Sequence, residues 1–289
     1  MSSTTDRLRQ LLAQDRLHVV PSCYDALSAK MIEQGGFSMV FMSGFAVSAA
    51  RLGLPDTGLI SYGEIVDQGR SICDAVTIPV LGDGDTGYGS ALNVKRTVKG
   101  YARAGFACVM IEDQVAPKRC GHTKGKVVVD RTEAQERIKA AVDAREEGAD
   151  ILIMARTDAR HEHGLDEALE RASRFKQIGA DILFVEAPRS VAEMERICRE
   201  VPGIHMANMV EGGETPLLSA EELHRIGFRI AAYPLTLLNA AMTAIRSALA
   251  TLSSGTHPED ALMPFPDLRK IVGFDDYYAE EQRYADRRP

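Results

Sequence analysis

The 289-residue sequence contains no tryptophan, and aromatic residues make up only 6% of it. It has no apolar run of about 18 residues, the length needed to cross a membrane, and no apolar signal-peptide centre follows its polar start. It also lacks a basic tract, and its formal net charge is −7, which argues against a nucleic-acid-binding surface. We therefore expect neither a membrane nor a nucleic acid as a partner.

Cysteine is scarce, and the five cysteines never form a C-x-x-C pair. An odd number of scattered cysteines suits neither a disulfide framework nor a zinc site. This pattern predicts a reducing, cytoplasmic location. What the chain has in quantity is hydrophobic residues, at 45%, and charged residues, at 26%, which is typical of a soluble protein with a sizeable core.

Short apolar, β-branched segments alternate with longer helical patterns along the chain. Most of these segments are continuously apolar, as parallel strands covered on both faces are. Several helical patterns end in glycine just before the next strand, which is a common signal for a helix C-terminus. We predict eight strands, at residues 17–22, 38–44, 78–85, 106–113, 150–158, 181–187, 204–209 and 228–234. The clearest helical patterns lie at residues 24–36, 91–105, 131–149 and 164–180.

Eight strands joined by helices predict an α/β protein with one (β/α)8 TIM barrel, in a single domain over residues 1–289. The alternative is a doubly wound sheet, which usually binds a nucleotide through a Gly-rich turn after its first strand. No G-x-G-x-x-G follows a candidate first strand, and "GDGDTGYG" places two aspartates where a phosphate needs uncharged backbone amides. We therefore favour the barrel. A helix within residues 1–16 is expected to cap its bottom or side, and a helical tail from about 237 to 289 is expected to pack on a neighbouring subunit.

Almost every predicted strand ends at a charged or amide residue, and the active site of such a barrel lies at these carboxyl ends. A single polar ending is ordinary, because a strand that leaves the core must meet water. The convergence of Asp83, Asp85 and Glu112 is less ordinary, because close carboxylates repel one another unless a positive group lies among them. The polar strand ends are Ser22, Ser43, Gly44, Asp83, Asp85, Glu112, Asp113, Arg156, Thr157, Asp158, Glu186, Asn208, Tyr233 and Pro234.

The simplest positive partner for these acids is a hard divalent cation. Carboxylate oxygens without histidine or thiolate neighbours favour Mg2+ or Mn2+ over zinc. The residues therefore indicate Asp83, Asp85 and Glu112 as metal-site candidates, with Asp56 from a preceding loop as a fourth.

Two further strand ends favour binding of an anion. The guanidinium of Arg156 can hold a carboxylate or an oxyanion through two parallel hydrogen bonds. The turn at Ser43 and Gly44 offers a hydroxyl and backbone amides for the same purpose. Together with a metal, these groups predict a site for a small 2-oxo or enolate acid.

The polar segment "APKRCGHTKG", residues 116–125, follows the acidic end of the fourth predicted strand. Its cysteine, Cys120, lies between Lys118 and Arg119 on one side and His122 on the other. Cationic neighbours lower the pKa of a thiol, so that it exchanges protons near neutral pH. The glycines of the segment allow it to fold over the mouth of the barrel as a lid.

This segment carries a resemblance to a known family. The motif "EDQVAPKRCGH" is similar to the signature of the isocitrate lyase / phosphoenolpyruvate mutase superfamily, and so are "GDGDTGYG", "IMARTDAR", "VEAP", "ANMVEGGETP" and "YPLT", which occur in the family's order. The resemblance extends from residue 21 to about residue 250. It implies a (β/α)8 barrel whose last helix swaps onto a partner subunit, in a homotetramer that is a dimer of helix-swapped dimers.

The resemblance also implies roles for particular residues. It implies Mg2+ (or Mn2+) held directly by Asp83, and held through waters by Asp56, Asp85 and Glu112. The implied catalytic residues are Cys120, Arg156, Glu186, His122 and Lys118, with the thiol as proton donor or acceptor. The implied residues around a small carboxylic acid substrate are Ser43, Gly44, Phe45, Tyr24, Asp85, Arg156, Gly121, His122, Asn208, Thr215, Pro216 and Pro234.

Within the family, the cysteine-containing loop resembles that of the lyases that cleave carbon–carbon bonds. This resemblance implies Mg2+-dependent cleavage of a malate substituted at carbon 3, either 2,3-dimethylmalate or 2-methylisocitrate. The implied products are pyruvate, or a related 2-oxo acid, and a carboxylate. The candidates for the base are a water on the metal, Tyr24 and Glu186. Two alternatives on the same scaffold are a carboxyphosphonoenolpyruvate-type phosphonomutase and an oxaloacetate hydrolase, although Pro234 departs from the serine usual in such hydrolases. A binding protein without catalytic activity is an alternative from another class.

Overall fold

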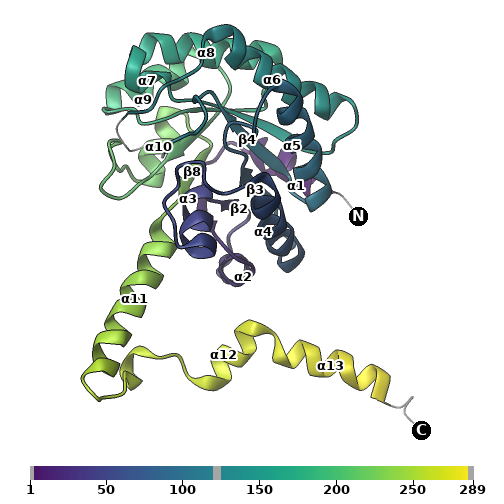
Figure 1. Ribbon diagram of the computed structural model, residues 1–289, viewed down its shortest axis with the longest axis vertical. Coiled ribbons are helices and arrows are strands. Elements are labelled where there is room, and N and C mark those ends of the chain that lie inside the picture. Colours follow the sequence, from purple (N-terminus) through teal and green to yellow (C-terminus); the bar gives the residue numbers. More distant parts are fainter. Residues whose placement is uncertain (1–2, 120–124, 286–289) are drawn as a thin grey trace. The chain divides into compact units, whose positions relative to one another are not determined.

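The protein was analysed as a computed structural model that describes residues 3–119 and 125–285. Its centre is a closed barrel of eight parallel strands, in which each strand pairs with the next one along the chain and the last pairs with the first (Figure 1). This arrangement confirms the predicted (β/α)8 barrel. The strands are β1 (His18–Cys23), β2 (Val40–Met42), β3 (Val80–Asp83), β4 (Cys108–Glu112), β5 (Leu152–Thr157), β6 (Ile182–Val185), β7 (Ile204–Asn208) and β8 (Ile230–Tyr233).

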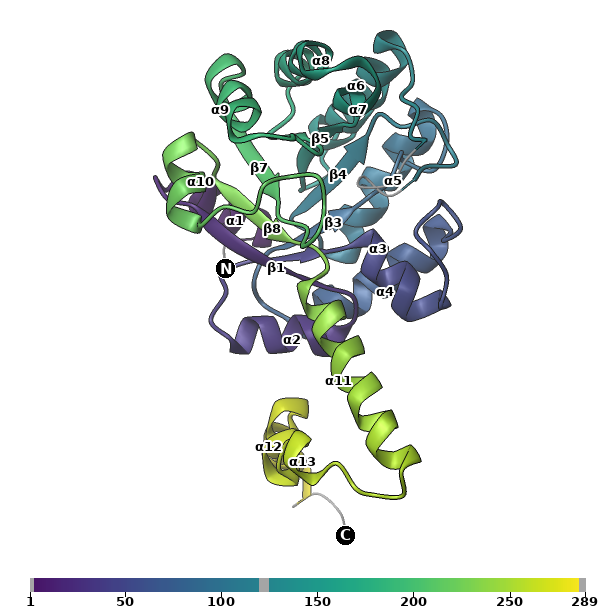
Figure 2. The same cartoon turned by 90° about the vertical axis from the view of Figure 1, so that its left-hand side faces the viewer.

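Helices follow the strands and surround the barrel (Figure 2). Most of them begin at side chains that accept a hydrogen bond from the first turn, such as Asp25 and Ser61, and some end at glycines with positive φ, such as Gly105 and Gly179. The outer helices are α2 (Ala26–Gln34), α4 (Tyr62–Ala75), α5 (Ala91–Ala104), α6 (Arg131–Glu146), α8 (Leu165–Ile178), α9 (Val191–Glu200) and α10 (Ala220–Ile226). Short turns α3 (Gly44–Val47), η1 (Ser48–Leu52) and α7 (Ala159–His163) follow strand ends.

The first helix, α1 (Thr4–Leu12), lies at the amino ends of the strands. Its Leu8 and Leu12 are buried in the same apolar cluster as inward-facing barrel residues such as Phe41. Thr5 Oγ1 donates a hydrogen bond of 2.9 Å to the carbonyl of Asp150, just before β5. This end of the barrel is therefore closed by a helix, and the opposite end carries the polar strand ends.

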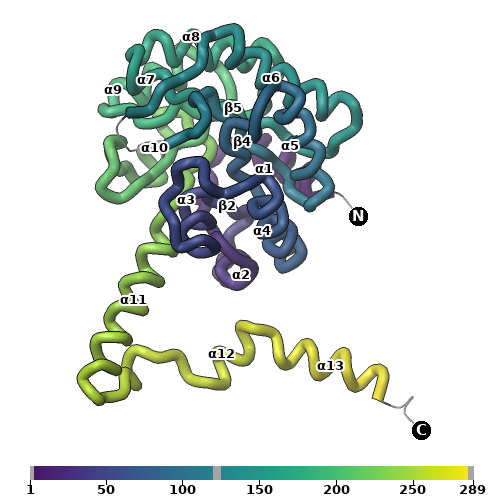
Figure 3. Tube along the Cα trace, viewed as in Figure 1, coloured from purple at the N-terminus to yellow at the C-terminus, as the bar shows by residue number. Residues whose placement is uncertain are grey.

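The chain forms two compact units, residues 1–237 and 238–289. The first unit contains the barrel. The second contains most of α11 (Thr236–Ser253), then η2 (Glu259–Ala261), α12 (Phe265–Val272) and α13 (Phe274–Ala285), which can be followed in Figure 3. Within it the guanidinium of Arg269 lies 5.2 Å from the ring centroid of Phe274. Across the described chain, no helix combines the length and the apolarity that crossing a membrane would require.

Gly84 follows the last residue of β3, Asp83, and packs closely against the neighbouring strand β4. A Cβ atom at Gly84 would lie 2.6 Å from the backbone oxygen of Met110, which accepts the Gly84 N–H at 2.9 Å. Because backbone cannot move aside as a side chain can, we expect Gly84→Ala to lower the free energy of unfolding by about 1–3 kcal/mol, measured by urea denaturation. Gly63→Ala in α4, where a Cβ meets only one side-chain oxygen at 3.9 Å, is the matched control and should be neutral or stabilising. Equal stability of the two variants would contradict this account.

Candidate active site

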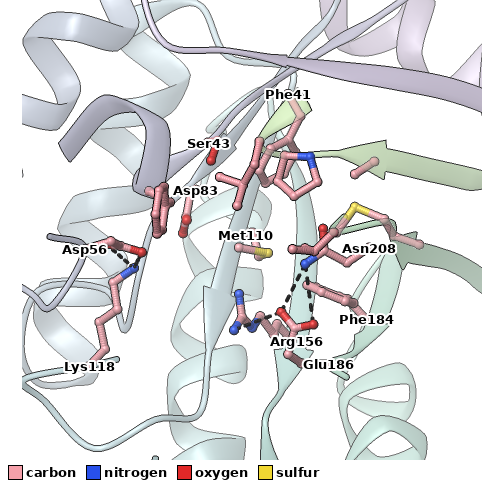
Figure 4. Close-up of a pocket in the computed structure, with 16 residues that line it drawn as sticks. Phe41, Ser43, Asp56, Asp83, Met110, Lys118, Arg156, Phe184, Glu186 and Asn208 are labelled. Carbon is pink, nitrogen blue, oxygen red and sulfur yellow. Dashed lines mark hydrogen bonds and ion pairs between the residues drawn. The ribbon is translucent and has the colours of Figure 1, made fainter. Parts of the chain in front are cut away.

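The polar strand ends meet at the carboxyl end of the barrel (Figure 4). Asp83 ends β3, Glu112 ends β4 and Asn208 ends β7. Glu112 and Arg156 are register partners on the neighbouring strands β4 and β5. The barrel therefore brings acidic and basic groups from distant parts of the sequence to one place.

The ammonium of Lys118 lies among the predicted metal-binding acids. Its Nζ is 2.7 Å from the carboxylate of Asp56 and 2.8 Å from Oδ1 of Asp85, and all three side chains are buried. Burial alone would lower the pKa of Lys118, but the surrounding carboxylates, those of Asp85, Asp83, Asp56 and Glu112, raise this pKa well above its ordinary value. The lysine therefore pairs with these acids as a cation.

Backbone groups hold the carboxylate of Asp83 in place. Its Oδ2 accepts the Gly44 N–H at 3.2 Å, and its Oδ1 accepts the Asp85 N–H at 3.0 Å. A Cβ at residue 44 would lie 2.5 Å from Oδ2, so only glycine allows this close approach. Asp85 itself has a φ of 48°, a strained conformation of the kind that functional sites retain. Burial raises the pKa of Asp83, and the charge of Lys118 opposes this effect.

Glu112 is the acid with the fewest partners. Its side chain is 1% exposed, neither carboxylate oxygen has a hydrogen-bond partner among the described residues, and the nearest positive group, Arg156 Nε, is 3.4 Å away. Burial raises the pKa of Glu112 well above its ordinary value, and Arg156 opposes this effect. A buried carboxylate that lacks a donor needs an explanation, and a bound cation would supply one.

The donor atoms around Lys118 suit a hard divalent ion, because all of them are carboxylate oxygens. Asp83, Asp85, Asp56 and Glu112 are the side chains that would hold it. Within residues 3–119 and 125–285, however, no three Asp, Glu, His or Cys side chains already form a group able to hold a metal ion. The set fits Mg2+ or Mn2+ in chemistry, and two of its carboxylates, those of Asp56 and Asp85, are paired with Lys118.

Arg156 contacts three carboxylates, those of Asp158, Glu186 and Glu112. Its Nε and Nη2 donate to the two oxygens of Asp158 at 2.8 and 3.0 Å. Its Nη2 also lies 3.1 Å from Oε2 of Glu186, which in turn accepts from Asn208 Nδ2 at 3.3 Å. The guanidinium lies 5.2 Å from the ring centroid of Phe184. Arg156 is thus a rigid group at the floor of the site, facing the cavity beside Glu186 and Asn208 (Figure 4).

A second layer of buried charges supports this arrangement. Lys126 Nζ lies 3.3 Å from Oδ1 of Asp158, and the Asp158 N–H donates to Asp113 Oδ1 at 2.9 Å. The other Asp113 oxygen accepts from Arg171 Nη1 of α8 at 3.1 Å. The sequence indicated Asp113 and Asp158 as strand ends, but Lys126 and Arg171 lie outside the strands and could not be placed beside them.

The polar groups border a cavity of about 230 Å3. Its wall divides into a polar part and an apolar part. The polar lining residues are Ser43, Asp56, Asp83, Lys118, Arg156, Glu186 and Asn208. The apolar lining residues are Phe41, Phe45, Met110, Phe184, Met206, Val210, Ala232, Pro234 and Leu235. The cations among these described lining residues, Lys118 and Arg156, are both already paired with carboxylates.

The predicted site residues are brought together only in part. Asp85 and Glu112 lie behind the lining, next to Lys118 and Arg156. The Gly44 N–H, expected to bind substrate, donates to Asp83 instead. Of the predicted set, Tyr24, Thr215 and Pro216 are not among the lining residues of the cavity. Cys120, Gly121 and His122 lie outside the described residues.

The residues that sequence reasoning missed are mostly apolar. Met110, Phe184 and Met206 lie inside strands, where an apolar residue is expected to fill the core. They line the cavity because they are inward-facing residues in the layer nearest the carboxyl end of the barrel. Their position within the strand was the available signal, since the inward-facing residue nearest the polar end of a strand faces the cavity.

Comparison with known proteins gives matches over most of the chain. The family model for phosphoenolpyruvate phosphomutase matches residues 8–253, which include all eight strands. The chain is 42% identical over 286 residues to 2,3-dimethylmalate lyase of Eubacterium barkeri, with 98% of this chain and 99% of that protein covered.

Two solved structures extend the comparison to the fold. A crystal structure of 2,3-dimethylmalate lyase, a member of the phosphoenolpyruvate mutase/isocitrate lyase superfamily, matches with a TM-score of 0.93 and 35% identity, covering 99% of this chain and 96% of that one. A crystal structure of phosphonopyruvate hydrolase in complex with oxalate and Mg2+ matches with a TM-score of 0.86 and 28% identity, covering 98% of this chain and 99% of that one. Both alignments therefore include the strand ends that form the cavity.

Proposed function

Because the chain belongs to the phosphoenolpyruvate mutase/isocitrate lyase superfamily of enzymes, we propose that it is a Mg2+-dependent lyase that splits a malate substituted at carbon 3. The products are pyruvate or a related 2-oxo acid and a second carboxylate. The observation that carries this proposal is that Asp83 and Arg156 line one small cavity, with Asp85 and Glu112 directly behind its wall. The 42% identity to 2,3-dimethylmalate lyase supports the same class of reaction.

The chain's own groups bind the end of the substrate that becomes the 2-oxo acid. Arg156 presents a fixed guanidinium, which can pair with the substrate carboxylate next to the reacting carbon. When bound at Asp83, Asp85, Asp56 and Glu112, Mg2+ (or Mn2+) would neutralise the charge that develops on the 2-oxygen as the bond breaks. The relative solved with oxalate and Mg2+ supports this choice of ligand and ion.

Two protons must move during the cleavage. The 2-hydroxyl loses one, and Glu186 is the candidate base that lines the cavity, whereas Tyr24 does not line it. The carbanion formed at carbon 3 is stabilised by its adjacent carboxylate and gains a proton, which we assign to Cys120. The bond between carbons 2 and 3 supplies the electron pair, so no oxidant or reductant is needed.

The composition of the cavity wall favours a dicarboxylate with an alkyl branch. The described lining residues include two cations, Lys118 and Arg156, so even with a divalent ion bound to the acids they offer one positive group to each of two substrate carboxylates. A third substrate carboxylate would therefore be poorly compensated. The apolar side, with Met206, Val210 and Leu235, is suited to a methyl group. We propose 2,3-dimethylmalate before 2-methylisocitrate.

A substrate panel tests the function. With Mg2+ present, pyruvate release from 2,3-dimethylmalate should exceed that from 2-methylisocitrate by about tenfold or more in kcat/KM, and EDTA should abolish it. Release can be followed by coupling to lactate dehydrogenase. Turnover of oxaloacetate alone would favour the hydrolase, and a phosphonate rearrangement seen by 31P NMR would favour the phosphonomutase. Failure on all of these acids would point to a binding protein without catalytic activity.

We also propose that the helices after the barrel pack on other subunits in a homotetramer built as a dimer of helix-swapped dimers, the tail of a single (β/α)8 domain. On α11, Met242, Ile245, Leu249 and Leu252 are each more than half exposed, at 59%, 59%, 60% and 52%. Their spacing of three or four residues places them on one face of the helix, and an apolar face of this kind is usually covered.

The four described cysteines, Cys23, Cys73, Cys108 and Cys198, are free thiols, which supports the predicted cytoplasmic location.

A further inference from the structure

The position of Lys118 has a consequence for how a metal binds. We propose that the Lys118 ammonium is the internal counter-ion of the metal site, and that a divalent ion binds by displacing it from Asp56 and Asp85. The displaced ammonium remains at the wall of the cavity and becomes available to the acid substrate. This inference rests on the proposed metal site and adds to it an order of events, metal first and then acid.

The contacts of Lys118 are those of a resident cation. Its Nζ lies 2.7 Å from Asp56 and 2.8 Å from Asp85, which are the distances of charge-assisted hydrogen bonds. The Lys118 and Asp56 side chains are each 5% exposed, and that of Asp85 is 7% exposed, so water does not screen these pairs. In Figure 4 Lys118 and Asp56 face each other on one side of the cavity, near Asp83. The ammonium thus occupies the place where the predicted metal-binding carboxylates converge.

A lysine and a divalent ion cannot use these oxygens in the same way at once. Mg2+ binds its oxygen ligands directly at about 2.1 Å, or through waters that themselves need acceptors on the carboxylates. Both carboxylate oxygens of Asp56 lie 2.7 Å from Nζ, and Oδ1 of Asp85 lies 2.8 Å from it. Two cations in one buried pocket also repel each other strongly. Binding of the metal and retention of both lysine ion pairs are therefore mutually exclusive.

Of the two lining cations, Lys118 is the one able to leave. Arg156 is held by a two-point interaction with Asp158, which contacts Lys126 in the layer behind. Lys118 is joined to Asp56 and Asp85 through one flexible four-carbon stem, which can move its charge by several ångströms without moving the backbone.

The displaced lysine could also serve the substrate. A dicarboxylate has a second carboxylate beyond the one that faces Arg156, and the polar wall of the cavity also carries Lys118. While Lys118 is paired with Asp56 and Asp85, this charge is not available. Metal binding releases the Lys118 ammonium. The metal should therefore increase the affinity for the acid substrate in two ways, by contacting the substrate itself and by freeing Lys118 to pair with it.

The test measures metal affinity without substrate. Mn2+ binding to the full-length protein can be followed by EPR or calorimetry in the wild type and in Lys118→Met, which removes the charge and keeps the length of the stem. We expect Lys118→Met to bind Mn2+ about tenfold or more tightly, within the range usual for coupling between two sites. Saturating Mn2+ should also raise the Tm of Lys118→Met by more than that of the wild type, because the ion then replaces the lost ion pairs.

Lys126→Met is the matched control. Lys126 is equally buried, at 4% exposed against 5%, but its carboxylate partner is Asp158 and not one of the four metal candidates. Its removal should increase Mn2+ affinity much less than removal of Lys118. Lys118→Arg, which keeps the charge, should retain wild-type or weaker affinity.

Each other outcome decides against one part of the account. Equal or weaker Mn2+ binding by Lys118→Met overturns the displacement, and so does an equal gain in Lys126→Met, because net charge alone would then explain it. Absence of Mn2+ binding in wild type and variants alike rejects the metal site itself and with it the proposed function. Circular dichroism of each variant separates these results from misfolding.

Discussion

Cys120→Ser is expected to abolish lyase turnover, with a fall in kcat of at least about 10³-fold. The thiol and the hydroxyl are similar in size, but a hydroxyl is a far weaker acid and cannot protonate the carbanion at neutral pH. From the sequence we expect the cationic neighbours Lys118 and Arg119 to lower the pKa of the Cys120 thiol, and they would give no comparable help to a serine hydroxyl. Pyruvate release from 2,3-dimethylmalate with Mg2+ is the measurement.

The control for this variant is another cysteine of the same chain. Cys198 is half-buried in α9, and burial raises the pKa of its thiol to about 12, so it is neutral at pH 7. Cys198→Ser should keep full turnover. Cys120→Ser should keep the circular dichroism spectrum and the Mn2+ affinity of the wild type, which shows that only the chemistry is lost. Undiminished turnover by Cys120→Ser would reject the role assigned to the thiol.

The described residues on both sides of the segment 120–124 are fixed at the site, which supports a role for what lies between them. On one side Lys118 pairs with Asp56 and Asp85. The backbone of Arg119 makes two hydrogen bonds of 2.9 Å with the side chain of Gln114, one through its N–H and one through its carbonyl. On the other side Lys126 is buried against Asp158.

The fold could be predicted from the sequence because its signals are local. Each strand is a short apolar run, and glycines such as Gly105 and Gly179 end the preceding helices where φ must be positive. A barrel of parallel strands then follows from the alternation alone. The strand ends Asp83, Glu112 and Arg156 could be placed at one mouth for the same reason, since the fold puts all carboxyl ends on one side.

The ion pairs of the site could not be predicted, because they join residues far apart in the chain. Lys118 and Asp56 are separated by 62 positions, and Arg171 and Asp113 by 58. No periodic pattern in the sequence predicts that residues with these separations lie side by side. The sequence indicated a group of acids that needs a cation and assigned a metal to them, whereas the described chain also supplies a cation of its own, Lys118. A lysine in a polar loop gives no sign that it is 5% exposed.

Arg156→Lys should be almost as damaging as the loss of the thiol, although it keeps the positive charge. The guanidinium contacts both oxygens of Asp158 and one of Glu186 at the same time, at 2.8 to 3.1 Å. A single ammonium cannot reproduce this planar set and still face a substrate carboxylate. We expect kcat/KM for 2,3-dimethylmalate to fall by at least about 10²–10³-fold, in line with the loss of one preorganised donor at a site of developing charge.

A second buried arginine shows whether this loss is specific to the site. Arg160 of α7 makes the same two-point interaction with Glu193, through Nε at 3.0 Å and Nη2 at 2.6 Å, and its side chain is 9% exposed, as is that of Arg156. Arg160→Lys should therefore lose a similar amount of stability, measured as a fall in Tm, and keep its turnover. If both variants lost activity equally, the guanidinium of Arg156 would be a structural group only. If Arg156→Lys stayed within tenfold of the wild type, the substrate carboxylate must bind elsewhere, and Lys118, released by the metal, is the other cation of the described lining that could receive it.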